Sequence, residues 1–146
     1  MIEHILLPTD GSALSENSVK YGLRLAKKLG ARVTALHVIP ASPTAVPVDD
    51  RTAPDGDART RAIVAHSRNY LDFARKAALG AGVECEVRQV AADYPFKAII
   101  AVAQEGPCDL IVMASHGRRG LESLLLGSET QKVLTHSRIP ILVCRE

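Results

Sequence analysis

Aromatic residues are scarce in this chain, which has no tryptophan, three tyrosines and two phenylalanines among 146 residues. The chain also has no large excess of positive or negative charge, because its formal net charge is only +2 at neutral pH. The chain therefore has no general attraction to nucleic acid or to an anionic membrane, and we expect neither as a partner. No apolar run approaches the ~20 residues of a membrane-spanning helix, and the N-terminus does not resemble a secretory signal. We expect a cytoplasmic protein whose ligand is recognised by a local site.

Cysteine is equally sparse. Cys85, Cys108 and Cys144 lie far apart and form no C-x-x-C pair. This spacing does not match a zinc or redox motif, and we expect reduced, mostly buried thiols. Because 47% of the residues are hydrophobic, the chain can build a core without disulfides or metals. We expect one domain that spans residues 1–146.

The hydrophobic pattern predicts a Rossmann-like α/β fold. Five segments have the length and composition of β-strands: Ile2–Leu7, Val33–Ile39, Glu84–Val90, Leu110–Met113 and Ile141–Val143. Longer segments with helical spacing separate them, and most of the strands are apolar at nearly every position. This alternation predicts a doubly wound, five-stranded parallel sheet with helices on both faces. One segment lies outside the pattern: residues 40–56 contain four prolines and three aspartates, and we expect a mobile insertion there.

Helix-capping residues support these boundaries. Ser12 is expected to accept hydrogen bonds from the first free amides of the first long helix, and Gly30 is expected to end that helix. Asp93 is expected to cap the third helix, with Pro95 in its first turn. The fourth helix is expected to start near Gly127 and to end before residue 140.

The segment after the fourth strand is the strongest candidate for a binding site. Its glycines let backbone amides converge on a ligand, and the N-terminus of the following helix adds free amides and about half a positive charge. Hydroxyl groups in the first helical turn and two arginines could add further contacts to an anion. These features are typical of a phosphate site, although glycines can also simply permit a tight loop. The residues concerned are Gly117, Arg118, Arg119, Gly120, Gly127, Ser128 and Thr130.

Two other strand ends should lie at the same edge, because ligands of open α/β sheets bind beyond the carboxyl ends of the strands. Asp10 follows the first strand, and its carboxylate suits ribose hydroxyls or a phosphate-bound metal, or else it accepts from amides of its own loop. Val38 follows in the second strand and offers an apolar wall and backbone hydrogen bonds to a base, or else it is a core residue. His37 beside it is expected to be structural.

Both ends of the sequence resemble the universal stress protein family. The matching stretches are ILLPTDGS at residues 5–12 and IPILV at residues 139–143, and the resemblance covers nearly the whole chain. The nucleotide-binding branch of that family carries G-x-x-G, nine residues, and then G-[S/T]. Here Gly117 is followed by nine residues and then by Gly127 and Ser128.

The resemblance implies ATP, AMP or another adenine nucleotide as ligand, with Mg²⁺ as a candidate companion held indirectly near Asp10. It places the base near Val38, and it implies the strand order 3-2-1-4-5. It also implies a homodimer through the last strand, at Ile141, Leu142, Val143 and Cys144. The nucleotide-binding residues that it implies are Pro8, Thr9, Asp10, Val38, Met113, Ala114, His116, Gly117, Arg118, Arg119, Gly120, Gly127, Ser128, Glu129 and Thr130.

Two residues depart from the family pattern. Ala114 replaces the first glycine of the motif, and its methyl group would crowd a ligand if the position needed close approach or a positive φ. Glu129 follows the Gly–Ser pair directly, where its charge favours the helix start and opposes a bound triphosphate, unless Mg²⁺ bridges the charges or the side chain turns to solvent.

The function that we expect is a regulatory or sensing module of the stress response that binds an adenine nucleotide with little or no turnover. A slow Mg²⁺-dependent ATP hydrolase stays open as an alternative, although no G-x-x-x-x-G-K-[ST] loop is present and His116 is the one candidate to orient a water. A nucleotide-free dimeric interaction module also stays open. A flavin carrier is disfavoured, because its phosphate loop would follow the first strand, and a phospho-acceptor receiver is disfavoured, because Val90 and Ala91 end the third strand.

Overall fold

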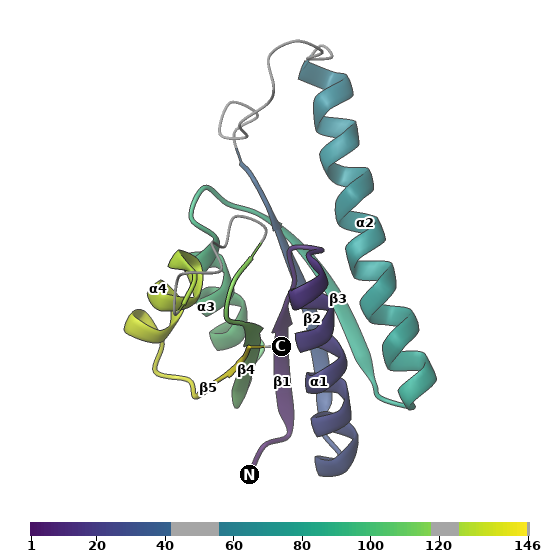
Figure 1. Cartoon of the computed structure of the whole chain (residues 1–146), viewed down its shortest axis with the longest axis vertical. Coiled ribbons are helices and arrows are strands. Elements are labelled where there is room, and N and C mark those ends of the chain that lie inside the picture. The colour runs from purple at the N-terminus through teal and green to yellow at the C-terminus, as the bar shows by residue number, and fades with distance from the viewer. Residues whose placement is uncertain (42–55, 118–125, 146) are drawn as a thin grey trace.

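The computed structural model describes residues 1–41, 56–117 and 126–145, and strands alternate with helices throughout (Figure 1). The strand bounds agree with the predicted ones to within two residues. The elements are β1 His4–Pro8, α1 Ala13–Leu29, β2 Arg32–Ile39, α2 Gly56–Ala81, β3 Cys85–Ala91, α3 Pro95–Glu105, β4 Leu110–Ala114, α4 Ser128–His136 and β5 Ile141–Cys144.

The five strands form one parallel sheet of order β3-β2-β1-β4-β5, which confirms the predicted fold and strand order. Ile5 in the central strand β1 pairs with Val33 of β2 on one side and with Leu110 of β4 on the other. The chain moves from β1 towards one edge of the sheet and then returns to β4 on the other side. The strand order therefore reverses between β1 and β4, which is where ligands bind in open α/β sheets.

The core consists of two apolar layers, one on each face of the sheet. Helices α1 and α2 cover one face, where Ile5 and Leu7 are fully buried, and α3 and α4 cover the other face, where Leu6 is fully buried (Figure 1). Consecutive residues of a strand point to opposite faces, so a strand covered on both sides is apolar at most positions. This burial explains the continuous apolar run in β1.

Helix α1 has both predicted caps. The Ser12 hydroxyl accepts a hydrogen bond from the Ser15 amide at 3.2 Å, and Gly30 ends the helix with a φ of 68°. Helix α2 begins at residue 56 and is 26 residues long, so one end of it extends past the sheet (Figure 1). The insertion predicted at residues 40–56 falls mostly on residues 42–55, which lie outside the described residues.

The predicted cap of α3 was wrong by one residue. Tyr94, not Asp93, is the N-cap residue, and its side chain makes no capping hydrogen bond. Pro95 is the first helical residue and has no N–H, so Phe96 carries the first amide of the helix that can donate. That amide donates to the carboxylate of Glu129 in α4 at 2.9 Å. A residue distant in sequence therefore performs the capping that Asp93 was expected to perform.

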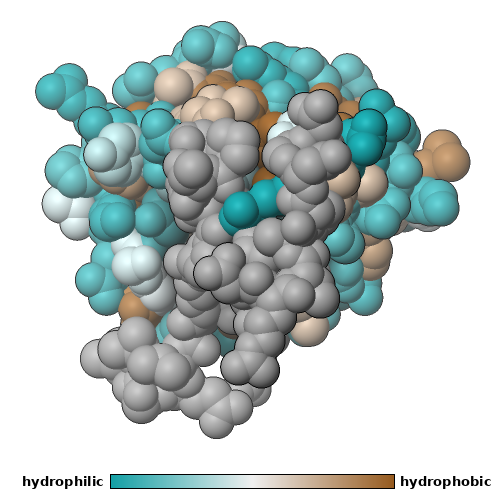
Figure 2. Space-filling view, turned by 90° about the horizontal axis from the view of Figure 1, so that it is seen from above, coloured by the Kyte–Doolittle hydropathy of each residue, from teal (hydrophilic) through white to brown (hydrophobic). Residues whose placement is uncertain are grey.

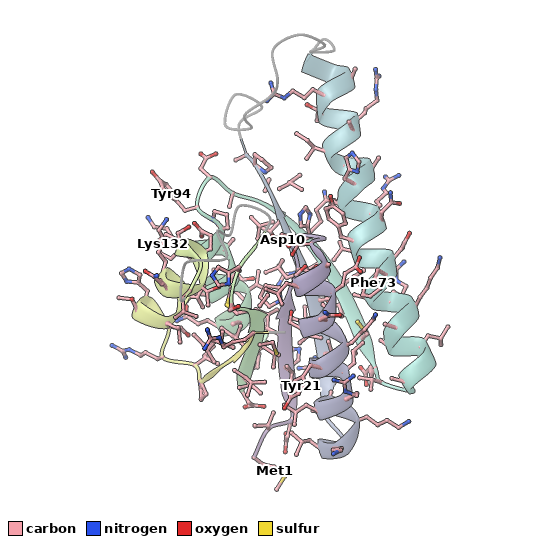
Figure 3. The ribbon with its side chains drawn as sticks, in the orientation of Figure 1. Met1, Asp10, Tyr21, Phe73, Tyr94 and Lys132 are labelled. Atoms are coloured by element: carbon pink, nitrogen blue, oxygen red, sulfur yellow. The ribbon has the colours of Figure 1, made fainter. Side chains whose placement is uncertain are left out.

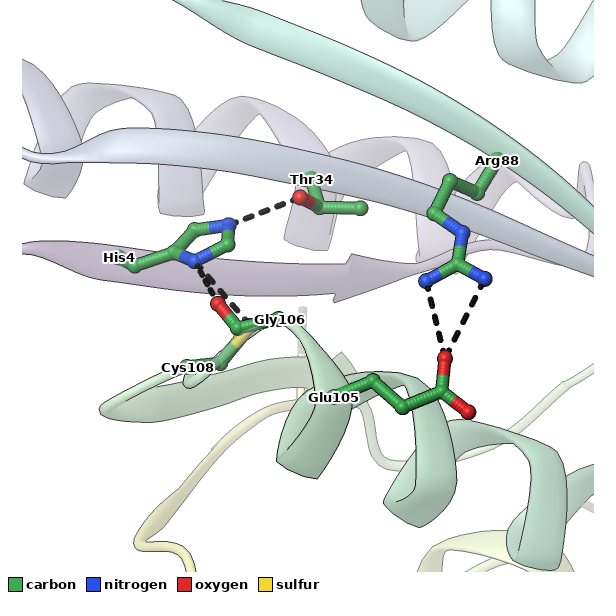
Figure 4. Close-up of polar contacts among 6 residues, drawn as sticks. All are labelled: His4, Thr34, Arg88, Glu105, Gly106 and Cys108. Carbon is green, nitrogen blue, oxygen red and sulfur yellow. Dashed lines mark hydrogen bonds and ion pairs between the residues drawn. The ribbon is translucent and has the colours of Figure 1, made fainter.

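At the amino ends of the strands, buried polar groups satisfy one another (Figure 4). The His4 ring is 4% exposed, with Nδ1 2.6 Å from the Gly106 carbonyl oxygen and Nε2 2.8 Å from the Thr34 hydroxyl. The Cys108 thiol lies beside His4, and burial raises its pKa to about 11. This network is structural, because its polar groups are buried and are hydrogen-bonded to one another.

Candidate functional site

The candidate site lies at the carboxyl ends of β1, β2 and β4, at the point where the strand order reverses. Asp10 is at the centre of this end of the sheet (Figure 3). Seen from this end, hydrophobic and hydrophilic residues both reach the surface (Figure 2). A Cβ atom added to Gly117, after β4, would lie 2.5 Å from Oδ2 of Asp10, after β1. The structure therefore brings together two predicted site residues that are over one hundred positions apart.

The loop after β1 uses most of its polar groups to hold its own shape. The Thr9 side chain is buried; its hydroxyl lies 3.0 Å from that of Ser15 and accepts from the Gly11 amide. Oδ1 of Asp10 accepts from both the amide and the hydroxyl of Ser12, at 3.0 and 2.6 Å. One carboxylate oxygen of Asp10 thus orders the loop, as one interpretation of the sequence held, and the other faces Gly117.

Helix α2 fixes this loop from the side, which the sequence did not predict. Gly11 has a φ of 77°, and the Tyr70 ring occupies the space that a Cβ there would need. The same ring packs edge-on against His37 of β2, with 5.0 Å between centroids, and Nδ1 of His37 is 2.7 Å from the buried Ser67 hydroxyl. His37 is therefore a structural residue, as predicted. The sequence signal for Tyr70 was only its place on the apolar stripe of α2.

Val38 has two backbone groups that face the place where the strand order reverses. Successive residues of a strand point their N–H and C=O groups alternately to its two neighbours. The Leu36 carbonyl accepts from Thr9 on the β1 side, whereas the Ile39 carbonyl accepts from Ala92 on the β3 side. Val38 therefore points its N–H and C=O towards β1, but β1 ends opposite Leu36. Neither group has a hydrogen-bond partner in the described part of the chain.

The end of β4 is buried and is hydrogen-bonded to β5. Met113 and Ala114 are buried, and the Ser115 amide donates to the carbonyl of Cys144 in β5 at 2.7 Å. No residue other than glycine has a positive φ in the described segments. The alanine at position 114 is therefore accommodated in ordinary strand conformation, and its methyl group causes no backbone strain.

Two groups that were expected to face a phosphate are instead bonded inside the protein. The Gly127 amide donates to the Ser115 carbonyl at 2.6 Å. The Thr130 side chain is 3% exposed, and its hydroxyl donates to the Ala114 carbonyl at 2.9 Å. These bonds correct the expectation that the Thr130 hydroxyl is free to donate to a ligand, because its single proton is already used. They attach the start of α4 to the end of β4.

The first turn of α4 still presents free amides. The first amides of an α-helix have no intrahelical acceptor, and they carry the positive end of the helix dipole. Within the residues described, no group accepts from the amides of Ser128 and Glu129. Ser128 is exposed, and Gly127 is close to the loop after β4, since a Cβ there would lie 3.8 Å from the Gly117 nitrogen. An anion at this helix end would also lie beside Gly117.

The Glu129 side chain is turned away from these amides. Oε2 accepts from the Phe96 amide at the start of α3, and Oε1 forms an ion pair with Lys132 at 3.2 Å. The carboxylate therefore points neither at the ligand position nor freely into solvent. His116 is half-buried with Nδ1 3.0 Å from the Ser115 hydroxyl, which agrees with a role in shaping the loop.

Several predicted features cannot be placed at this site. Arg118, Arg119 and Gly120 lie outside the described residues. In the described ranges, no three His, Cys, Asp or Glu side chains gather as metal ligands, and no helix has the length and apolar character to cross a membrane. An open groove of about 410 Å³ lies elsewhere, between α2 and β3, and shares no residue with the site.

Known proteins resemble this chain over its full length. Universal stress protein MJ0531 of Methanocaldococcus jannaschii is 29% identical over 147 residues, covering 100% of this chain and 84% of that protein. The solved structure of MJ0577, from the same organism, is 27% identical with a TM-score of 0.83, covering 100% of this chain and 97% of that one. A universal stress protein solved in complex with cyclic AMP has the same fold, with 22% identity, a TM-score of 0.73 and coverage of 99% and 97%.

The family assignment rests on the whole described architecture as well as on sequence. The sheet order, the loop after β1 and the glycine motif before α4 all lie where the resemblance placed them. The model of the universal stress protein family matches residues 1–145. The chain therefore belongs to the universal stress protein family.

Proposed function

We propose that this chain binds an adenine nucleotide at the carboxyl ends of β1, β2 and β4, and that it works as a regulatory or sensing module of the stress response with little or no turnover. The observation that carries the proposal is the pair of backbone groups at Val38, which have no partner among the described residues and lie across the strand-order reversal from the first amides of α4. The first pair suits the edge of a base, and the second suits a phosphate.

The orientation of the Val38 groups favours adenine. The Watson–Crick edge of adenine carries an acceptor nitrogen beside an amino donor, which matches one N–H and one C=O. Guanine presents an acceptor oxygen beside a ring N–H in the reverse order, so it would pair with the same two groups only with its ring turned over. The half-buried Val38 side chain adds an apolar surface next to the base.

The phosphates would lie at the start of α4. Their hydrogen-bond donors would be the amides of Ser128 and Glu129 together with that of Gly117, and Arg118, Arg119 and Gly120 are assigned to the same group from sequence. Asp10 would then contact ribose hydroxyls, or Mg²⁺ carried by the phosphates, through the carboxylate oxygen that faces Gly117. Pro8, Thr9, Met113, Ala114, His116, Gly127 and Thr130 shape the walls of the site.

Low turnover is part of the proposal. Asp10 is the one carboxylate that the described residues bring to Gly117, and Nδ1 of His116 lies 3.0 Å from the Ser115 hydroxyl. Hydrolysis needs a held metal and an oriented water, and neither has a set of side chains there among the residues described. The solved relative that holds cyclic AMP fits a ligand that is sensed rather than consumed.

The remaining parts of the proposal concern assembly and location. Strand β5 pairs with β4 alone in the described structure, so the other edge of Ile141–Cys144 is open to a second copy. We propose one domain per chain, a homodimer through β5 and a cytoplasmic location.

The direct test is to identify any small molecule that the freshly purified protein retains, by mass spectrometry of the denatured sample. Calorimetric titration with ATP, AMP and cyclic AMP should then give saturable heat, while GTP at equal concentration should give little. Absence of heat with all three adenine ligands at millimolar concentration would reject nucleotide binding. It would favour the nucleotide-free interaction module. Release of phosphate from ATP in the presence of Mg²⁺, at an enzymatic rate, would instead support the alternative of a slow ATP hydrolase.

A further inference from the structure

We propose that Glu129 determines which charge state of nucleotide the site accepts, favouring AMP and cyclic AMP over ATP that carries no metal. This inference rests on the proposed function, because it concerns the same site. It depends on where the structure fixes one carboxylate, and it goes beyond nucleotide binding to selection among nucleotides.

The position of Glu129 in α4 brings its charge close to the phosphates. It is the second residue of the helix, and its own amide is one of the free donors of the first turn. Its carboxylate is turned towards the start of α3, but helical side chains tilt towards the N-terminus, so the charge stays near the first turn of α4. A phosphate bound by these amides would therefore experience the negative charge of Glu129.

The carboxylate cannot move away without losing contacts. Its Oε2 accepts the amide of Phe96, which is the first amide of α3 that can donate because Pro95 precedes it. Removing Glu129 from that amide would leave the start of α3 uncapped. Tyr94 is close to Phe96 in sequence and Lys132 is close to Glu129, and both lie on the same side of the molecule (Figure 3). The charge is thus held in place by a helix that does not belong to the nucleotide site.

Lys132 reduces this charge but does not cancel it. Its nitrogen is 3.2 Å from Oε1, and the two side chains are 47% and 37% exposed. Ion pairs with this exposure are screened by solvent and are weak. A second carboxylate, that of Asp10, lies close to Gly117. A polyphosphate would bring more negative charge near Glu129 than a single phosphate would.

The expected size of the effect follows from Coulomb's law. Two unit charges about 8 Å apart change an equilibrium constant by roughly two- to sixfold, for effective dielectric constants between about 80 and 40. Free ATP carries about two more negative charges than AMP, and each adds such a factor, so removal of the Glu129 charge should raise the ratio of ATP to AMP affinity roughly fourfold or more. Adenosine has no phosphate, and its affinity should not change.

The test compares adenosine, AMP and ATP binding by calorimetry in EDTA for wild type and Glu129→Gln. Glutamine keeps an oxygen that can accept the Phe96 amide, so α3 stays capped while the charge is lost. Glu105→Gln is the matched control, because Glu105 is an exposed carboxylate at the far end of α3 that pairs with Arg88. The predicted result is a ratio of ATP to AMP affinity that rises about fourfold or more in Glu129→Gln and is unchanged in Glu105→Gln.

A reciprocal variant keeps the proposal testable if Glu129→Gln is poorly folded. Lys132→Gln leaves the Glu129 carboxylate without its cation, and the ATP to AMP ratio should then fall. With saturating Mg²⁺, the net charge of ATP approaches that of AMP, so the difference between wild type and Glu129→Gln should shrink. Charge selection would be rejected if both variants bound adenosine and AMP but kept the wild-type ratio of ATP to AMP affinity. That result would leave nucleotide binding intact. Absence of binding by every adenine ligand to wild type would reject both proposals.

Discussion

The polar groups at the two ends of the sheet differ in whether they have hydrogen-bond partners. At the amino ends, His4, Thr34 and Gly106 satisfy one another in the interior, and the Asp109 carboxylate accepts from the amides of residues 3 and 4. At the carboxyl ends, the backbone groups of Val38 and the first amides of α4 have no acceptor or donor among the described residues. Satisfied polar groups stabilise a fold, whereas unsatisfied groups at a surface are available to a ligand. Polar residues at the amino end therefore stabilise the fold, whereas those at the carboxyl end are available to bind a ligand.

The largest effect is expected at the amino end. His4→Ala leaves the Thr34 hydroxyl and the Gly106 carbonyl without their partner and creates a cavity, so the free energy of unfolding should fall by about 3 kcal/mol. The melting temperature should then drop by about 10 °C. Calorimetry of nucleotide binding below the transition should show unchanged affinity. Arg88→Ala, which removes only an exposed ion pair, is the control and should cost under about 1 kcal/mol. A loss of affinity at full stability would contradict the separation of the two ends.

The next effect belongs to the carboxyl end. Gly117→Val places a branched side chain against the Asp10 carboxylate, and it should weaken ATP binding on the order of 100-fold, or about 2.7 kcal/mol. The fold should persist, because Gly117 is exposed. Gly80→Ala is the matched control, since Gly80 lies in α2 with open space around it. Unfolding of Gly117→Val would show instead that this glycine holds the fold.

Thr130→Val tests a residue that lies at the site but is bonded inside the protein. The substitution removes the hydroxyl that donates to the Ala114 carbonyl. The free energy of unfolding should therefore fall by about 1–2 kcal/mol. Affinity for ATP should change less than about threefold, since the hydroxyl does not point at the ligand. Chemical denaturation and calorimetry measure the two quantities. Unchanged stability with tenfold weaker binding would mean that the hydroxyl contacts the nucleotide.

The smallest effect concerns acid stability at the amino end. Hydrogen bonds from the amides of Glu3 and His4 hold the pKa of Asp109 below its usual range. A depressed pKa stabilises the fold above the unfolded-state pKa, near pH 4, and this stabilisation is lost as the pH falls through the folded-state pKa. Asp109→Asn should therefore flatten the loss of stability below about pH 4, as followed by urea midpoints from pH 6 to pH 3. Equal slopes for both proteins would show that Asp109 is not part of the acid response.

The sequence predicted the parts of this structure that depend on local pattern. Apolar runs placed the strands, and Ser12 and Gly30 marked the ends of α1 because both caps act within a few residues. The sequence could not predict contacts between distant segments. The link from Glu129 to the Phe96 amide replaced the expected Asp93 cap, and the Tyr70 ring against Gly11 depends on how α2 crosses the sheet. Likewise, nothing in the sequence indicated that the Thr130 hydroxyl is bonded, because its acceptor, the Ala114 carbonyl, is at the end of strand β4, 16 residues away.

The most direct test of the account is a titration of the ¹⁵N-labelled protein with ATP, followed by the backbone amide resonances of the described residues. The account predicts that the amides of Val38, Gly117 and Ser128 shift together with one dissociation constant, while those of Glu3, His4 and Asp109 stay where they are. Shifts confined to other parts of the surface, with Val38 and Ser128 unmoved at saturation, would contradict the claim that the unpartnered groups at the carboxyl end form the nucleotide site.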